Sequence, residues 1–126
     1  ERDLPDDIQS QRETLQHEAH CEALPPDLLP GMVEAQRLRD AALTHAAIAA
    51  HHETLARGER APVVVITGNG HARNDWGLPS LLRGAGNGLS VQSVAQFEEE
   101  VPEGAEFDHW LVTEAAERED PCAAFE

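Results

Sequence analysis

The chain has 126 residues, a hydrophobic content of 40% and a formal net charge of −15, with 24 acidic residues against 9 basic ones. This length suits one domain with a core of its own. So strong a negative charge repels phosphate backbones and argues against nucleic acid as a partner. No apolar run approaches the roughly 20 residues of a membrane-spanning helix, and the first residues given lack the charged-then-apolar pattern of a signal peptide.

A first helix is predicted to begin near Pro5, because a proline followed by acidic residues suits a first helical turn. It runs to about Ala23, before Pro25 ends it. His20 and Cys21 fall on one side of this helix. That side either lines a pocket or is a solvated polar face with incidental histidines.

A second helix is predicted from Met32 to about Arg57, with Gly58 as its C-terminal cap. We expect its apolar stripe to consist of residues at helical spacing, namely Leu38, Ala41, Ile48 and Leu55. A short helix is expected over residues 78–82, and strands over residues 89–97 and 107–113.

The continuous aliphatic run at residues 63–67, bounded by Pro62 and Gly68, predicts a buried parallel strand. In open α/β sheets, ligand sites gather beyond the carboxyl ends of such strands. The motif GNGHAR follows this run at residues 68–73. The sequence therefore predicts an α/β fold with a ligand site at this motif.

Two glycines in the motif, Gly68 and Gly70, let the backbone take positive φ and approach a ligand closely. His71 and Arg73 add a titratable ligand and a permanent cation, which suits an acidic ligand or a metal-bound anion. We expect His71 to lie on a loop and to line the main cavity. The alternative is an ordinary loop histidine.

Gln36 and Arg39 are one turn apart on the second helix and share a face. If that face turns toward the end of the predicted strand, Arg39 and Arg73 bracket one anion, with Gln36 nearby. The alternative is a surface arginine paired with a neighbouring carboxylate.

These segments together resemble a known family. LPGMVEAQRLRDAA at residues 29–42, the run 63–67, GNGHAR and the GLP of residues 77–79 are similar to the C-terminal half of ChaN-like haem-binding lipoproteins. That family is grouped with the Tiki, TraB and erythromycin-esterase proteins, and the resemblance extends over nearly the whole chain to Cys122. It implies a three-layer α/β/α fold with a mostly parallel sheet. Residues 1–126 would form the C-terminal part of one such domain, with the N-terminal half absent.

The resemblance implies a haem-binding protein of bacterial iron acquisition, more a binding protein than an enzyme. Because the chain has no tyrosine, the axial ligand would be His71, His20 or Met32, or would lie upstream. We expect the cofactor site to use residues of the motifs above: His71, Arg73, Gln36, Arg39, Gly68, Gly70 and His20.

The alternative function is a metal-dependent hydrolase of the Tiki or erythromycin-esterase type. There His71 would bind a divalent metal ion or act as a general base, together with an upstream glutamate. An acidic scaffold without a ligand is a third alternative.

The resemblance also implies a periplasmic or outer-membrane-associated protein of a Gram-negative bacterium. Membrane attachment would come only from a lipid anchor on a missing N-terminal segment, and a homodimer remains an open alternative. Because exported proteins with two cysteines commonly pair them, we expect a Cys21–Cys122 disulfide. The competing interpretation is two free thiols in a cytoplasmic protein.

Overall fold

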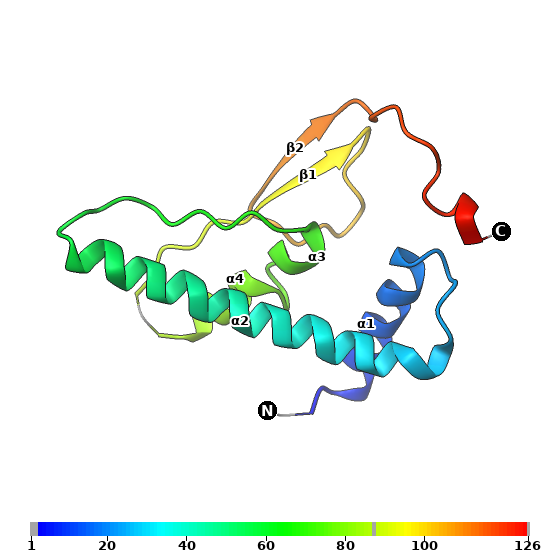
Figure 1. Ribbon diagram of the computed structural model, residues 1–126, viewed down its shortest axis with the longest axis horizontal. Coiled ribbons are helices and arrows are strands. Elements are labelled where there is room, and N and C mark those ends of the chain that lie inside the picture. Colours follow the sequence, from blue (N-terminus) through cyan, green and yellow to red (C-terminus); the bar gives the residue numbers. More distant parts are fainter. Residues whose placement is uncertain (1–2, 87, 126) are drawn as a thin grey trace. The chain divides into compact units, whose positions relative to one another are not determined.

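The computed structural model describes residues 3–86 and 88–125. Figure 1 shows its elements in chain order: α1 (Asp6–Ala19), η1 (Pro26–Leu28), α2 (Leu29–Ala56), α3 (Asn69–Ala72), α4 (Leu78–Gly84), β1 (Val94–Glu98), β2 (His109–Thr113) and η2 (Ala123–Phe125). Within these residues, no helix combines the length and the apolar character that crossing a bilayer requires. The fold is thus a mixture of helices and strands.

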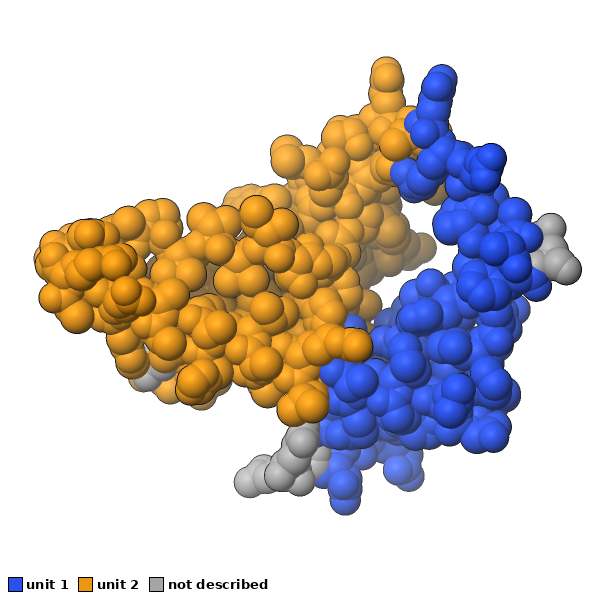
Figure 2. Space-filling view, in the orientation of Figure 1, with its two compact units in different colours: residues 1–37, 117–126 blue, residues 38–116 orange. Residues whose placement is uncertain are grey.

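The chain forms two compact units, shown in different colours in Figure 2. Unit 1 consists of residues 1–37 and 117–126, and unit 2 consists of residues 38–116. Helix α2 begins in unit 1 and continues into unit 2.

Helix α1 of unit 1 begins at Asp6, directly after Pro5, as predicted. Two acidic residues in its first turn interact favourably with the helix dipole. The helix ends at Ala19, before the predicted Ala23, because Cys21 and Glu22 adopt left-handed backbone conformations with φ of 60° and 55°. Such residues end a helix.

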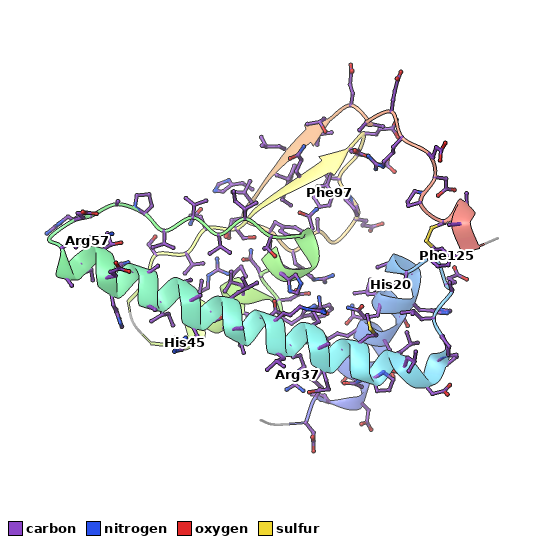
Figure 3. All side chains as sticks on the ribbon, viewed as in Figure 1. His20, Arg37, His45, Arg57, Phe97 and Phe125 are labelled. Carbon is purple, nitrogen blue, oxygen red and sulfur yellow. A yellow bond between two sulfur atoms is a disulfide. The ribbon has the colours of Figure 1, made fainter. Side chains whose placement is uncertain are left out.

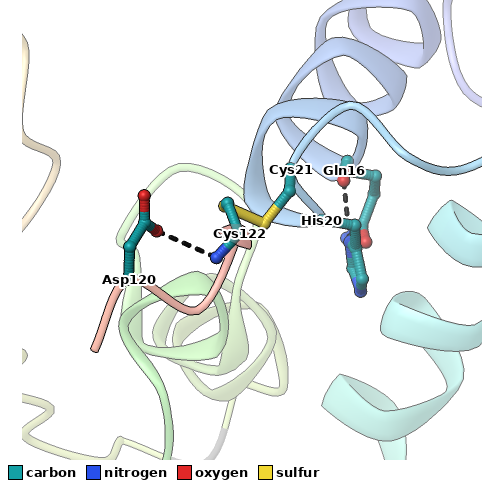
Figure 4. The surroundings of a disulfide bond; sticks show 5 residues. All are labelled: Gln16, His20, Cys21, Asp120 and Cys122. Atoms are coloured by element: carbon teal, nitrogen blue, oxygen red, sulfur yellow. Dashed lines mark hydrogen bonds between the residues drawn. A yellow bond between two sulfur atoms is a disulfide. The ribbon is translucent and has the colours of Figure 1, made fainter. Parts of the chain in front are cut away.

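The disulfide between Cys21 and Cys122 joins the end of α1 to the C-terminal segment, which confirms the predicted pairing (Figure 4). The backbone N–H of Cys122 donates to the Asp120 carboxylate at 2.9 Å, which shapes the turn on the other side of the bond. The bridge therefore links segments of unit 1 that are 101 residues apart in sequence.

Helix α2 starts at Leu29, earlier than the predicted Met32, because a helix tolerates Pro30 in its first turn. It ends at Ala56, and Gly58 follows with φ of +73°. The Gly58 N–H donates to the Leu55 carbonyl at 2.9 Å, so the predicted C-terminal cap is confirmed.

The predicted apolar stripe of α2 is wrong. Leu38 and Leu55 are 68% and 52% exposed. Beyond buried Leu29 at its start, the buried positions recur every seven residues, two helical turns apart: Val33, Asp40, Ala47 and Thr54. Leu38 and Leu55 therefore lie on another face of the helix, while the inward positions after Val33 hold small or polar side chains.

The predicted buried strand at residues 63–67 is also wrong in the described chain. The segment is extended, but none of its backbone groups pairs with another described strand. Val64 and Ile66 are 77% and 94% exposed. An aliphatic run becomes a buried strand only where neighbouring strands and helices cover it, and the described residues supply no such neighbours here.

Strands β1 and β2 pair in parallel, from Val94 opposite His109 to Glu98 opposite Thr113. They are shorter than the predicted strands at residues 89–97 and 107–113. The Phe97 ring on β1 (Figure 3) meets the Phe107 ring edge-on, with the ring centroids 5.7 Å apart. The predicted short helix is present as α4, with Pro79 in its first turn.

Candidate functional site

The most distinctive polar contact in unit 2 joins α3 to α2. Nδ1 of His71 lies 2.7 Å from Oδ1 of Asp40. The Asp40 side chain is 1% exposed, and the His71 side chain is 23% exposed. A carboxylate accepts hydrogen bonds, so Nδ1 of His71 carries the hydrogen and donates it. The contact therefore fixes both the tautomer and the orientation of the imidazole.

In the neutral form of the imidazole, Nε2, the other ring nitrogen of His71, then carries the lone pair. Among the described residues, no group hydrogen-bonds to this atom. A carboxylate behind one ring nitrogen also makes the other nitrogen a better ligand. His71 is thus held by a buried carboxylate, and its Nε2 is available for a metal centre or a proton.

The one-turn helix α3 is held at both ends. The Asn69 side-chain amide donates to the Gln96 carbonyl on β1 at 2.9 Å. At the other end, the buried Ser93 hydroxyl donates to the Ala72 carbonyl. His71 therefore lies on a short helix fixed to β1 and the segment before it, rather than on the predicted loop.

The glycine that matters sterically is Gly77 rather than Gly68 or Gly70. Gly68 has φ of −71° and Gly70 is inside α3, so neither position uses the positive φ that glycine permits. A Cβ on Gly77 would clash with the carbonyl oxygens of His71 and Arg73, the latter at 2.8 Å. Close packing against the His71 backbone thus requires glycine at position 77.

Arg73 is already paired. Its Nε and Nη2 donate to the two carboxylate oxygens of Asp75 at 2.9 and 2.6 Å. Its guanidinium also lies 4.0 Å from the centre of the Trp76 ring. An anionic ligand would have to compete with Asp75 for Arg73. By contrast, Arg39 is exposed and has no hydrogen bond or ion pair among the described residues.

Two predicted site residues belong to unit 1. Gln36 Oε1 accepts from Arg12 Nη2 at 3.2 Å and from Gln16 Nε2 at 3.1 Å. His20 Nδ1 donates to the Gln16 carbonyl at 2.7 Å, as Figure 4 shows. These contacts tie both residues to α1. The convergence of Arg39 and Arg73 on one anion, with Gln36 nearby, stays a prediction.

A charged cluster stabilises the segment before β1. Asp108 accepts from the Ser93 backbone N–H at 2.7 Å and from Arg83 Nη2 at 2.9 Å. The Ser93 hydrogen bond in particular lowers the pKa of Asp108, and Arg83 acts in the same direction. Because the Ser93 side chain also bonds α3, this cluster supports the position of His71.

Unit 2 has a cavity of about 610 Å³ beside α3. Thr67 and Ala72, which flank the GNGH motif, contribute to its wall, but His71 is not among its lining residues. The expectation that His71 itself lines this cavity is therefore wrong, since its ring turns toward Asp40 instead.

The described residues contain no cluster of three or more histidine, cysteine or acidic side chains arranged to hold a metal ion. A catalytic zinc site generally has three protein ligands. The site of His71 therefore provides one well-oriented nitrogen donor within the described part of the chain.

Asp40 and Gly77 make the contacts around His71 to which the sequence analysis assigned no role, although both lie within the segments that carry the family resemblance. Asp40 lies 31 residues before His71, and no local spacing connects the two. The position of Asp40 could have been inferred from its spacing, because it lies seven residues from both Val33 and Ala47, on the inward face of α2. An acidic residue at such a position requires a partner.

No curated protein and no solved structure matches the chain. A family model described as haem-binding uptake, Tiki superfamily, ChaN matches residues 2–82. The match covers more than half of the 126 residues and includes α2, α3 and the His71–Asp40 pair, but not the strands. By this match the chain belongs to the ChaN family of the Tiki superfamily.

Proposed function

We propose that this protein binds haem, with Nε2 of His71 as the axial ligand of the iron. The observation that carries the proposal is the 2.7 Å hydrogen bond between Nδ1 of His71 and buried Asp40. Ligating histidines generally donate their second ring N–H to a carboxylate or carbonyl. The family description, which names haem-binding uptake, supports the same ligand.

The donor set also favours haem over a free metal ion. A porphyrin supplies four nitrogen ligands, so a single protein imidazole is enough to hold the iron. A divalent ion alone would need further side-chain ligands. The described residues offer no such group, whereas His71 supplies the one donor that haem requires.

Haem also needs apolar contacts and partners for its propionates. Val64 and Ile66 expose aliphatic side chains just before the GNGH motif. Arg39 lies next to Asp40 and has no ion pair among the described residues. We expect Arg39 to bind a propionate more readily than Arg73, because Arg73 is paired with Asp75.

We also propose that the protein serves iron acquisition in the periplasm or at the outer membrane. The Cys21–Cys122 disulfide supports an oxidising compartment. We further propose that residues 1–126 are the C-terminal part of a three-layer α/β/α domain, with the ligand at the carboxyl end of its sheet. The exposed aliphatic run at residues 63–67 supports this, because it has the composition of a central strand.

A titration of the protein with haem, followed in the visible spectrum, tests the proposal. The wild type should give a shifted Soret band that saturates at one haem per chain. His71→Ala should lose that band, while His20→Ala and His45→Ala should retain it. His45 is a matched control because it is an exposed histidine of α2 (Figure 3). An unchanged titration with His71→Ala would reject His71 as the ligand.

A hydrolase remains the second candidate, because a histidine oriented by a carboxylate is also the arrangement of a general base. The same His71–Asp40 hydrogen bond favours it. The titration separates the two functions. A hydrolase of this type should retain a divalent metal ion and show no Soret shift, whereas the haem protein should show the shift without added metal.

A further inference from the structure

The cavity in unit 2 is a candidate for a second ligand site. Its volume of about 610 Å³ falls in the range of small-molecule sites. The walls come from Ala47 and His51 of α2, residues 60–65, α4 and residues 88–94. Most of these side chains are aliphatic, so the cavity favours the apolar body of a ligand.

The charges around this cavity are unlike those of the rest of the protein. Although the chain has 24 acidic residues, the described residues that line the cavity include no carboxylate, and Arg60 is the only permanently charged one among them. Arg60 has no ion pair among the described residues. Its neighbour Arg57, in contrast, bonds Glu53 at 3.1 Å and Glu59 at 3.4 Å. An unpaired guanidinium beside an apolar cavity suits an organic anion.

We propose that this cavity binds an aliphatic carboxylate, with its hydrocarbon body inside and its carboxylate on Arg60. Transfer of the hydrocarbon from water favours binding, and the guanidinium fork provides two parallel hydrogen bonds to the carboxylate. His51, one turn after Ala47 on the same wall, provides a further polar group. His71 is not among the lining residues, so the carboxylate site does not use the proposed haem ligand, although Val64 contributes to the cavity wall as well as to the proposed haem surface.

Calorimetric titration with dodecanoate below its micelle concentration tests the site. Arg60→Gln should weaken binding by about ten- to hundredfold, the cost of a charged hydrogen bond. Arg57→Gln is the matched control. It removes the same charge at the end of α2 (Figure 3). Because Arg57 does not line the cavity, this change should leave the affinity for dodecanoate unchanged. Equal affinities for wild type and Arg60→Gln would overturn the proposal.

Dodecanol isolates the contribution of the carboxylate. It should bind wild type and Arg60→Gln equally, since it offers no negative charge to the guanidinium. A loss of dodecanol binding in Arg60→Gln, as large as the loss for dodecanoate, would contradict the assigned role of Arg60.

A second pair of variants tests the cavity itself. Ala61→Trp places a bulky ring at an exposed lining position and should abolish dodecanoate binding. Ala56→Trp, at the exposed end of α2 outside the lining, should not. Equal binding by both variants would overturn the cavity as the site.

Haem is itself an amphipathic carboxylate, so its titration distinguishes one site from two. Arg60→Gln should leave the Soret titration unchanged while dodecanoate binding falls. If Arg60→Gln weakens haem and dodecanoate binding equally, the two ligands share one site and the proposed separation is wrong.

Discussion

Nδ1 of His71 donates a 2.7 Å hydrogen bond to Asp40, across 31 residues of sequence. The carboxylate is buried on α2, whereas the imidazole is partly exposed on α3. This relationship fixes which nitrogen of His71 faces a ligand.

Asp40→Asn should lower the affinity for haem by about 10- to 100-fold, because the imidazole loses its charged hydrogen-bond acceptor. The folded structure should persist, since asparagine has nearly the same shape. Haem affinity and circular dichroism measure the two effects. Asp27→Asn, at an exposed position, is the control. Equal haem affinities for the two variants would remove Asp40 from the site.

Gly77→Ala should lower the free energy of unfolding by about 1–3 kcal/mol, because its Cβ would collide with two backbone carbonyls. Gly84→Ala is the matched control, since a Cβ there meets nothing within 4 Å. That change should be neutral or raise the free energy of unfolding by about 0.4–1 kcal/mol. Urea denaturation compares the two variants. Equal stability would contradict the crowding at Gly77.

Replacing Cys21 and Cys122 by serine should lower the free energy of unfolding. For a closed loop of roughly 100 residues, the chain-entropy model gives about 4–5 kcal/mol. Urea denaturation of the oxidised wild type and the double variant measures this difference. Thiol titration of the unreduced, denatured wild type should find no free thiol, and a finding of two would exclude the bridge.

Asp108 should make stability depend on pH in the acid range. Its pKa is lower in the folded chain than the ordinary 3.8, mainly because of the Ser93 N–H, so the ionised form favours folding. This contribution is complete above the ordinary pKa and is lost as the pH falls through the lowered value. Asp108→Asn should therefore be less stable than wild type at pH 7. The difference should shrink below pH ~4.

Urea midpoints at pH 7 and pH 3 measure this dependence. The exposed Asp27→Asn variant provides the control for loss of one charge. A difference between wild type and Asp108→Asn that stays constant across this range would contradict the assigned role of Asp108.

The helix ends were predictable because their signals are local. Pro5 and Gly58 set the start of α1 and the end of α2, as expected. The pairing of Cys21 with Cys122 followed from the number of cysteines and the compartment that the family resemblance implies. The helix ends needed only a few adjacent residues, and the disulfide needed only the number of cysteines and the expected compartment.

The inward face of α2 was not predictable from hydropathy. Leu38 and Leu55 have the spacing of a core stripe, yet both are exposed, while Asp40 is buried through its contact with His71. The prediction of a buried strand at residues 63–67 was wrong for a related reason. The composition of this run specifies a buried strand, but burial depends on covering segments elsewhere in the fold. Neither the inward face of α2 nor the exposure of residues 63–67 can be read from the neighbouring residues alone.

A His71→Gly variant removes the proposed iron ligand, and free imidazole can take its place. The variant should fail to give the wild-type Soret band with haem. Added imidazole should restore the band by supplying the missing ligand beside Asp40. A His71→Gly protein that binds haem with the wild-type spectrum and affinity, without imidazole, would contradict the account.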